Sequence, residues 1–216
     1  MHVTEESVAD FAEREGISPR RVRVLIHDGR LPARQVGGQW LVDQASEYRP
    51  ASSRPLSAHM RTFLVGALSG QELIDASASD RSRLRRYCKQ LRESDHPDRL
   101  LAGWVPQRPV LKLAVAPSDL NDLGQDALIV KSGFSDPRAQ IAAAGQLEAR
   151  VAAADLVSLR RDYLLRPSDR PNVFVHVADE RSPSPLPLGL LLIDLANHDG
   201  VRERSRVAEL LREISV

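Results

Sequence analysis

The sequence contains a single cysteine, Cys88, among 216 residues. One cysteine excludes a disulfide within the chain and is typical of a reducing compartment, so we expect a cytoplasmic protein. The segment around it, RLRRYCKQL, favours a small buried side chain over a reactive thiol.

Long hydrophobic runs are also absent. The longest, LGLLLIDLA at 188–196, is far shorter than the roughly 20 residues that cross a bilayer, and it contains Asp194. The N-terminus has no basic segment followed by an apolar core. We therefore expect no signal peptide and no membrane partner.

Aromatic residues make up only 4% of the chain, and lysine accounts for only Lys89, Lys112 and Lys131 among its 30 basic residues. The core must therefore consist mainly of Leu, Val, Ile and Ala, and arginine carries most of the positive charge. A hydrophobic content of 42% with 27% charged residues is typical of a folded, soluble protein. The length allows one large domain or two smaller ones.

Catalytic and metal-binding patterns are missing as well. The sequence has no GxSxG elbow, no Walker A motif and no GxGxxG. No HxH, HExxH or Cys-His spacing occurs among the six scattered histidines: His2, His27, His59, His96, His176 and His198. DHPD at 95–98 is interpreted as a loop or helix cap. We expect a protein that is not an enzyme and that binds neither a cofactor nor a metal.

Two short helices are predicted near the N-terminus. The first covers 5–15, with Thr4 as its N-cap and Gly16 as its stop. The second follows Ser18 as N-cap, has a proline at its first helical position and stops at Gly29. The connection between them is as short as a helix-turn-helix requires.

A two-stranded hairpin is predicted next. The extended runs ARQV and QWLV are joined by Gly37 and Gly38, which tolerate the positive φ of a tight turn. We expect Trp40, the largest apolar side chain here, to pack onto the helices and anchor the hairpin. Residues 1–49 are thus predicted to form a winged helix-turn-helix domain, and 50–56 a linker.

Charge is polarised within this domain, although the net charge of the whole chain is only +1. Residues 5–15 hold five acidic residues and one arginine, whereas 18–42 hold five arginines and one aspartate. Arg20, Arg21 and Arg23 crowd the start of the second helix, where the helix dipole disfavours cations. This crowding indicates a polyanionic partner, and we predict double-stranded DNA.

The candidate DNA contacts follow from the geometry of a helix-turn-helix. The start of its second helix meets base edges in the major groove, where arginine suits guanine O6 and N7. The hairpin arms reach flanking phosphate or the minor groove. A solvated arginine-rich helix is the alternative, and the order of caps, stops and Gly-Gly turn favours DNA binding. The predicted DNA-binding residues are Ser18, Arg20, Arg21, Arg23, His27, Arg34 and Gln39.

Residues 3–42 resemble the winged helix-turn-helix of excisionase and MerR-type regulators. The specific parts are SPRRV, DGRLPA and the GGQW turn. The resemblance implies that this domain binds DNA. The long coiled coil and the effector domain of MerR regulators are not visible in the sequence.

The remainder, 57–216, is predicted to be a larger mixed α+β domain, which makes the chain α+β as a whole. Apolar spacing predicts helices at 56–70, 79–94, 96–106, 154–165, 188–197 and 201–214. Alternating or β-rich runs predict strands at 109–116, 126–133 and 171–179, while QLEARVA fits either a strand or a helix.

The larger domain resembles the antitoxins of type IV (AbiE-like) toxin–antitoxin pairs. The resemblance lies in RPLSAHMRTFLVGALSG, SDRSRLRRYCKQL, IVKSGFSDPRAQI, LLRPSDRPNVFVHV and LPLGLLLIDLANHDGVRERSRVAELL. It implies repression of the chain's own operon by binding its promoter, and antagonism of a partner nucleotidyltransferase-type toxin. A homodimer on DNA is left open. The alternative is a stand-alone regulator or excisionase-like factor whose second domain binds an effector or partner.

One further helix carries a positive stripe. Arg81, Arg85, Lys89 and Arg92 fall at i, i+4, i+8 and i+11. A second contact with the DNA backbone, a dock for an acidic partner and a solvated face all fit this pattern, and the solvated face is the commonest explanation.

Overall fold

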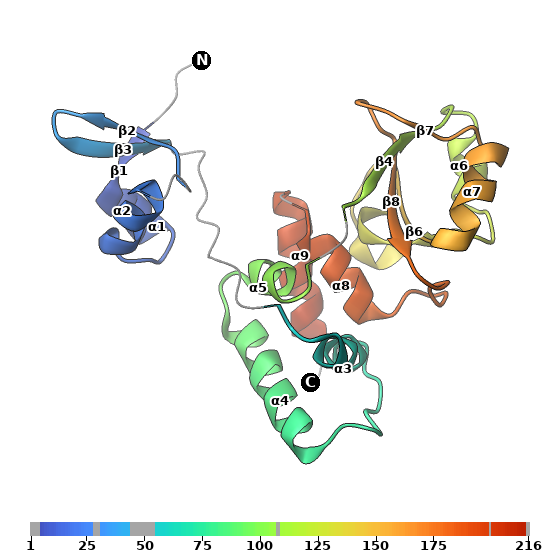
Figure 1. Ribbon diagram of the computed structural model, residues 1–216, viewed down its shortest axis with the longest axis horizontal. Coiled ribbons are helices and arrows are strands. Elements are labelled where there is room, and N and C mark those ends of the chain that lie inside the picture. Colours follow the sequence, from blue (N-terminus) through green and yellow to red (C-terminus); the bar gives the residue numbers. More distant parts are fainter. Residues whose placement is uncertain (1–4, 28–30, 44–54, 107–108, 199, 215–216) are drawn as a thin grey trace. The chain divides into compact units, whose positions relative to one another are not determined.

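A computed structural model describes residues 5–27, 31–43, 55–106, 109–198 and 200–214. The chain divides into two compact units, Met1–Ala51 and Ser52–Val216 (Figure 1). Helices and sheets occur in both, which confirms the α+β class.

The first unit is a small three-stranded antiparallel sheet with two helices. The sheet order is β1-β3-β2, and buried side chains of both helices and β3 form one core with Phe11 and Val42 at its centre. The elements are β1 (Glu5–Ser7), α1 (Val8–Arg14), α2 (Pro19–His27), β2 (Ala33–Val36) and β3 (Gln39–Asp43).

The start of the first helix differs from the prediction. Residues 5–7 form a strand rather than helix, because they pair with the free edge of β3 from Asp43 to Leu41. Ser7 caps α1 and accepts a hydrogen bond from the Asp10 amide at 3.2 Å. Thr4, the expected cap, lies outside the described residues. Pairing with a strand that is distant in the sequence therefore overrides the local helix preference of residues 5–7.

The connection from α1 to α2 follows the prediction. Gly16 has a φ of +63° and ends α1, and the Ile17 amide donates back to the Ala12 carbonyl at 2.9 Å. Ser18 then caps α2, accepting from the Arg21 amide at 3.2 Å. Gly29, the expected stop of α2, lies outside the described residues.

The β2–β3 hairpin is also confirmed. Val36 pairs with Gln39 across a two-residue turn in which Gly37 and Gly38 have φ values of +55° and +82°. Positive φ at both central positions is what a type I′ turn requires.

The expected role of Trp40 is wrong. Its side chain is 36% exposed and does not belong to the core of the unit. Trp40 and Val42 are two residues apart on β3 and therefore lie on the same face of the sheet. Val42 is fully buried in the core formed with the helices, whereas Trp40 lies opposite Gln35 next to the hairpin turn, outside that core.

The second unit contains a five-stranded sheet in the order β5-β6-β8-β4-β7. β6 and β8 are parallel, and the other neighbours are antiparallel. The ambiguous segment QLEARVA is thus strand β6. The strands are β4 (Leu111–Ala114), β5 (Val130–Lys131), β6 (Leu147–Ala152), β7 (Arg166–Pro167) and β8 (Val173–Ala178).

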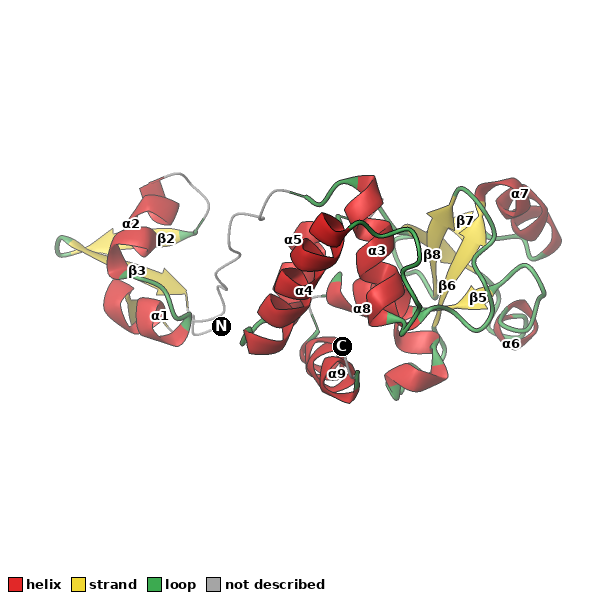
Figure 2. Cartoon of the chain, turned by 90° about the horizontal axis from the view of Figure 1, so that it is seen from below, coloured by secondary structure: helices red, strands yellow, loops and turns green. Residues whose placement is uncertain are grey.

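Helices form two groups around this sheet (Figures 1 and 2). The short α6 (Leu120–Leu123) and α7 (Ala153–Asp162) share a core with the strands. Five others build a separate helical core in which α8, apolar on nearly all sides, is central. They are α3 (Ala58–Leu68), α4 (Ala78–Glu93), α5 (Pro97–Trp104), α8 (Leu188–Ala196) and α9 (Val201–Glu213).

The expected linker, 50–56, is shorter than predicted. Leu56 is buried, and its amide donates to the Trp104 carbonyl at 2.9 Å, so this position is part of the second unit. Residues 50–54 lie outside the described residues.

The different burial of Trp40 and Val42 predicts unequal effects of truncation. Val42→Ala removes a fully buried side chain and should lower the stability of the first unit by about 1–3 kcal/mol. Trp40→Ala should lower it less, because Trp40 is 36% exposed and lies outside the core of the unit. Amide hydrogen exchange across α1 and α2 in the full chain measures both effects, and stronger destabilisation by Trp40→Ala would contradict this core assignment.

Candidate functional site

The first candidate site is the outer face of α2. Arg20, Arg23 and His27 are exposed at i, i+3 and i+7, so they form one stripe along the helix. Val24 lies on the same stripe and is 40% exposed. The opposite face, Val22, Leu25 and Ile26, is buried in the core of the unit. The stripe is therefore free of intramolecular packing.

Charge pairing within the unit leaves this stripe uncompensated. Arg14 binds the carboxylate of Glu6 at 2.6 Å, and Arg34 binds that of Glu5 at 2.5 Å. By contrast, Arg20, Arg21 and Arg23 make no ion pair within the part of the chain that the structure describes. The basic residues that pair with the acidic face of the unit are thus not the ones at the start of α2.

Arg34, one of the predicted contacts, is already engaged in an ion pair. Its Nε and Nη2 donate to the two carboxylate oxygens of Glu5 at 2.6 and 2.5 Å, across the sheet from β2 to β1. Hydrogen bonding to Arg34 lowers the pKa of Glu5, and the reciprocal contact raises the pKa of Arg34. The hairpin is braced by this pair, which the sequence did not reveal because β1 was expected to be helix.

The remaining predicted residues fall into two kinds. Ser18 is exposed, and its hydroxyl caps α2, while Arg21 is half-buried at the flank of the stripe. Gln39 is exposed directly after the hairpin turn. The structure thus brings Arg20, Arg23 and His27 to one face. Val24 is the residue that sequence reasoning missed, although its place at i+4 from Arg20 was the available signal.

The second candidate site is a buried ionic cluster in the second unit. Glu148, on β6, is completely buried and accepts hydrogen bonds from His176 Nε2 at 2.7 Å and His198 Nε2 at 2.9 Å. The backbone amide of Phe134 donates to the same carboxylate at 3.0 Å. A single carboxylate therefore connects β6, β8, the end of α8 and the turn after β5.

A second carboxylate extends the cluster. Asp194, in the last turn of α8, is completely buried and accepts hydrogen bonds from Arg150 Nε and Nη2 at 2.7 and 2.5 Å. The hydroxyl of Ser132, also fully buried, donates to Asp194. His176 Nδ1 is buried without a hydrogen bond and lies 3.8 Å from Asp194 Oδ1. The bidentate Arg150 pair fixes α8 against the sheet.

The backbone at Gly133 is shaped to admit the Glu148 carboxylate. Its φ is +48°, and a Cβ atom placed there would overlap that carboxylate. Only glycine adopts this positive φ readily and also leaves room for the carboxylate of Glu148.

Opposing influences set the ionisation of this cluster. Burial alone would raise the pKa of Glu148, but hydrogen bonds from His176 and His198 outweigh it and lower that pKa to about 2. Burial likewise disfavours the charged form of His198, but the hydrogen bond and charge of Glu148 prevail and raise its pKa. Glu148 is therefore held as a carboxylate.

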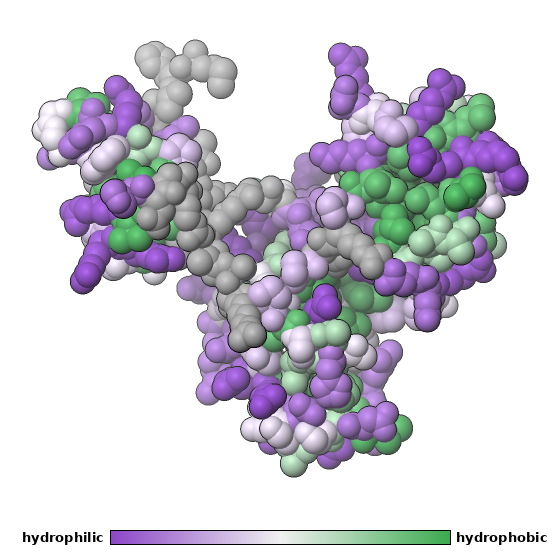
Figure 3. All heavy atoms as spheres, viewed as in Figure 1, coloured by the Kyte–Doolittle hydropathy of each residue, from purple (hydrophilic) through white to green (hydrophobic). Residues whose placement is uncertain are grey.

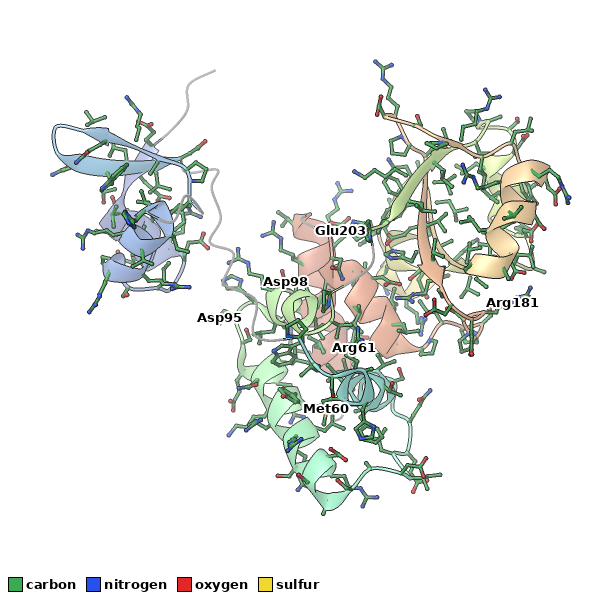
Figure 4. All side chains as sticks on the ribbon, viewed as in Figure 1. Met60, Arg61, Asp95, Asp98, Arg181 and Glu203 are labelled. Atoms are coloured by element: carbon green, nitrogen blue, oxygen red, sulfur yellow. The ribbon has the colours of Figure 1, made fainter. Side chains whose placement is uncertain are left out.

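The cluster borders a cavity of about 540 Å³. Arg150 and His176 line it from the sheet, and Arg61 of α3, labelled in Figure 4, lines it from the helical layer. Arg61 makes no ion pair with any described residue. The cavity thus combines the positive groups Arg61 and Arg150 with the carboxylate of Asp179 and with apolar side chains such as Val65 and Ile193.

The two histidines of the cluster, His176 and His198, form no recognisable motif in the sequence because they lie far apart. The signal that was available is Asp194 inside an otherwise apolar run and Glu148 inside a strand, since buried charges require partners. Within the described residues, no group of three or more His, Cys, Asp or Glu side chains could hold a metal ion. Nor does any described helix have the length and hydrophobicity needed to span a bilayer.

The Glu148–His198 pair predicts how stability depends on pH. The contribution of Glu148 is present above about pH 4.5 and is lost as the pH falls towards 2. That of His198 is present below pH 6.5 and is lost as the pH rises through its raised pKa. We expect this cluster to stabilise the second unit most between these two limits.

The pH dependence assigned to His198 is tested with His198→Gln, a variant that retains a hydrogen-bond donor but cannot titrate. Urea midpoints of the second unit should fall from about pH 6 to pH 9 in the wild type and fall less in the variant. Equal slopes for both proteins in this range would contradict the assigned role of His198.

Comparison with known proteins adds no relative: no family model, no curated protein and no solved structure matches the chain.

Proposed function

We propose that this chain is a DNA-binding antitoxin that represses its own operon through a winged helix-turn-helix in its first unit. The observation that carries the proposal is the exposed α2 stripe of Arg20, Arg23, Val24 and His27, whose guanidinium groups make no ion pair in the described chain. A cytoplasmic location belongs to the same proposal, since the promoter lies there.

The chemistry of the stripe suits the major groove. Each guanidinium can donate to guanine O6 and N7 together, and an exposed Val24 can contact a thymine methyl group. A helix fits the width of the groove, and its first turns face the base edges in helix-turn-helix proteins. Two arginines and one apolar group therefore favour sites that contain both guanine and thymine.

The hairpin supplies the flanking contacts in this proposal. Gln39 is exposed at the turn, and Arg34 is exposed although Glu5 binds it. The Glu5 pair neutralises part of the charge of Arg34, so its contact with phosphate is weaker than that of a free arginine. We therefore assign Arg34 mainly to holding the hairpin and Gln39 to reaching DNA. A homodimer on the operator remains open.

The antitoxin role of the second unit is supported by the resemblance of its segments to type IV antitoxins. The proposed partner is a nucleotidyltransferase-type toxin, and the chain itself is proposed to be no enzyme. Ser132, the one hydroxyl in the buried cluster, is completely buried and already donates to Asp194, so it is not placed to attack a substrate.

A second candidate function is a stand-alone regulator that responds to a small effector. The cavity beside Arg150 and His176 favours this alternative, because Arg61 on its wall makes no ion pair with any described residue. The two candidates share the DNA-binding unit and differ in what the second unit binds.

Alanine substitutions on the α2 stripe test the DNA-binding proposal. Arg20→Ala and Arg23→Ala should each weaken binding to the promoter by about 1–3 kcal/mol, roughly 5- to 150-fold, and reduce discrimination against unrelated DNA. Arg166→Ala, an exposed arginine of the second unit, is the matched control and should bind as the wild type does. Gel-shift titrations at several salt concentrations measure this. Unchanged promoter affinity in the double α2 variant would remove the basis of the proposal.

Co-expression tests the antitoxin role. The chain should restore growth to cells that express a toxic nucleotidyltransferase-type product of the neighbouring reading frame. Restoration should persist in the Arg20→Ala, Arg23→Ala variant, because neutralisation is assigned to the second unit. Absence of a toxic neighbour, together with ligand-dependent DNA binding, would favour the effector alternative.

A further inference from the structure

The cavity of about 540 Å³ lies between the sheet and the helical group of the second unit. Arg150 and His176 line it from β6 and β8, Arg61 lines it from α3, and Leu190 and Ile193 line it from α8. In the view of Figure 1, hydrophobic side chains gather over the sheet, whereas hydrophilic ones are more frequent over the neighbouring helices (Figure 3). The volume of the cavity is within the about 300–1,000 Å³ typical of small-molecule sites.

His176 places an unsatisfied polar atom on the wall of this cavity. The residue is 4% exposed, and its Nε2 donates to the Glu148 carboxylate at 2.7 Å. Within the part of the chain that the structure describes, His176 Nδ1 is the only buried side-chain polar atom without a hydrogen-bond partner. Asp194 Oδ1, at 3.8 Å, is too distant to serve as one. Buried polar atoms are nearly always paired, so this atom indicates a polar partner that binds from outside the chain.

Arg61 supplies a positive charge to the same cavity. It is half-buried and makes no ion pair with any described residue. The guanidinium of Arg150, by contrast, binds both carboxylate oxygens of Asp194, so its charge is balanced within the chain. An arginine without an internal partner can bind a carboxylate through two parallel hydrogen bonds. The cavity therefore favours an anionic ligand.

The other lining residues restrict the kind of anion. Asp179 also lines the cavity, and its negative charge opposes a dianion such as phosphate. Most of the remaining lining residues are apolar, and they gain from a ligand that buries apolar surface, which phosphate does not have. They include Val65, Val105, Val177, Leu190 and Ile193.

We propose that this cavity binds a hydroxy-substituted organic monocarboxylate with a branched or aromatic body. The carboxylate binds Arg61, and the body packs on the apolar lining. The hydroxyl completes the hydrogen bonding of His176 Nδ1, because a hydroxyl can both donate and accept. This inference does not rest on the antitoxin function, and it names the ligand class for the effector alternative.

Calorimetric titration of the full-length chain provides the test. The ligands are hydroxyisovalerate, mandelate and phenyllactate, each compared with the parent acid that lacks the hydroxyl, with its neutral amide and with inorganic phosphate. Arg61→Gln removes the positive charge, and Arg83→Gln makes the same change at an exposed residue of α4 that does not line the cavity. Ala58→Trp adds bulk at an exposed lining residue without changing the charge. Circular dichroism melting confirms that each variant is folded.

We expect at least one hydroxy acid to bind the wild type with a dissociation constant below about 1 mM and to raise its melting temperature. Arg61→Gln and the neutral amide should each weaken binding about tenfold or more, and loss of the hydroxyl about threefold, because charged hydrogen bonds contribute more than neutral ones. Ala58→Trp should abolish binding, and Arg83→Gln should bind as the wild type does. Inorganic phosphate should bind more weakly than the hydroxy acid.

Several results would overturn the inference. These are no binding by any of the three acids, equal affinity of wild type and Arg61→Gln, or equal loss in Arg61→Gln and Arg83→Gln. Tighter binding of phosphate would replace the proposed ligand class with phosphate, and equal affinity for an acid and its parent would remove the contact with His176. If Arg61→Gln does not fold, unchanged binding by Ala58→Trp decides against the cavity. Gel shifts of the wild type test the DNA-binding proposal separately, so its failure would not be mistaken for failure of this one.

Discussion

The fold of the second unit depends on the buried carboxylate of Glu148. It receives two histidines and one backbone amide, and these groups come from β6, β8, the end of α8 and the turn after β5. A buried charge without partners would be strongly unfavourable, so each of these segments must reach its place for the others to be stable. The helical layer and the sheet are thus held together by polar contacts as well as by apolar packing, since their two hydrophobic cores are separate.

The first unit contains ion pairs nearer to its surface. Arg14 and Arg34 bind Glu6 and Glu5, while the arginines of α2 make no ion pair with any residue that the structure describes. Surface ion pairs contribute little to stability. Their main effect here is on the distribution of charge, because they keep the acidic side chains from competing with an external polyanion for Arg20 and Arg23.

Local sequence signals predicted most of the short-range structure and little of the long-range structure. The Gly16 stop, the Ser18 cap and the Gly37–Gly38 turn depend on the conformations of neighbouring residues, and each was predictable. The strand at 5–7 depends on which edge of β3 is free, and the exposure of Trp40 depends on how far the helical core extends along that strand. The Glu148 cluster joins residues up to 50 positions apart, so no spacing rule could reveal it. Asp194 in an apolar run showed only that a partner was needed.

The close approach between Gly133 and the Glu148 carboxylate restricts which residues the sequence can have at these two positions. Any side chain there would overlap the Glu148 carboxylate, and the positive φ disfavours other residues independently. Two residues 15 positions apart are therefore linked by sterics, and Ser132 and Asp194 are linked to them through the same buried cluster. Relatives too divergent for overall similarity to be detected should still retain a Ser-Gly pair before the buried glutamate and an aspartate in the later apolar helix. We expect this pattern to be retained because the buried contacts of Gly133 and Asp194 require it.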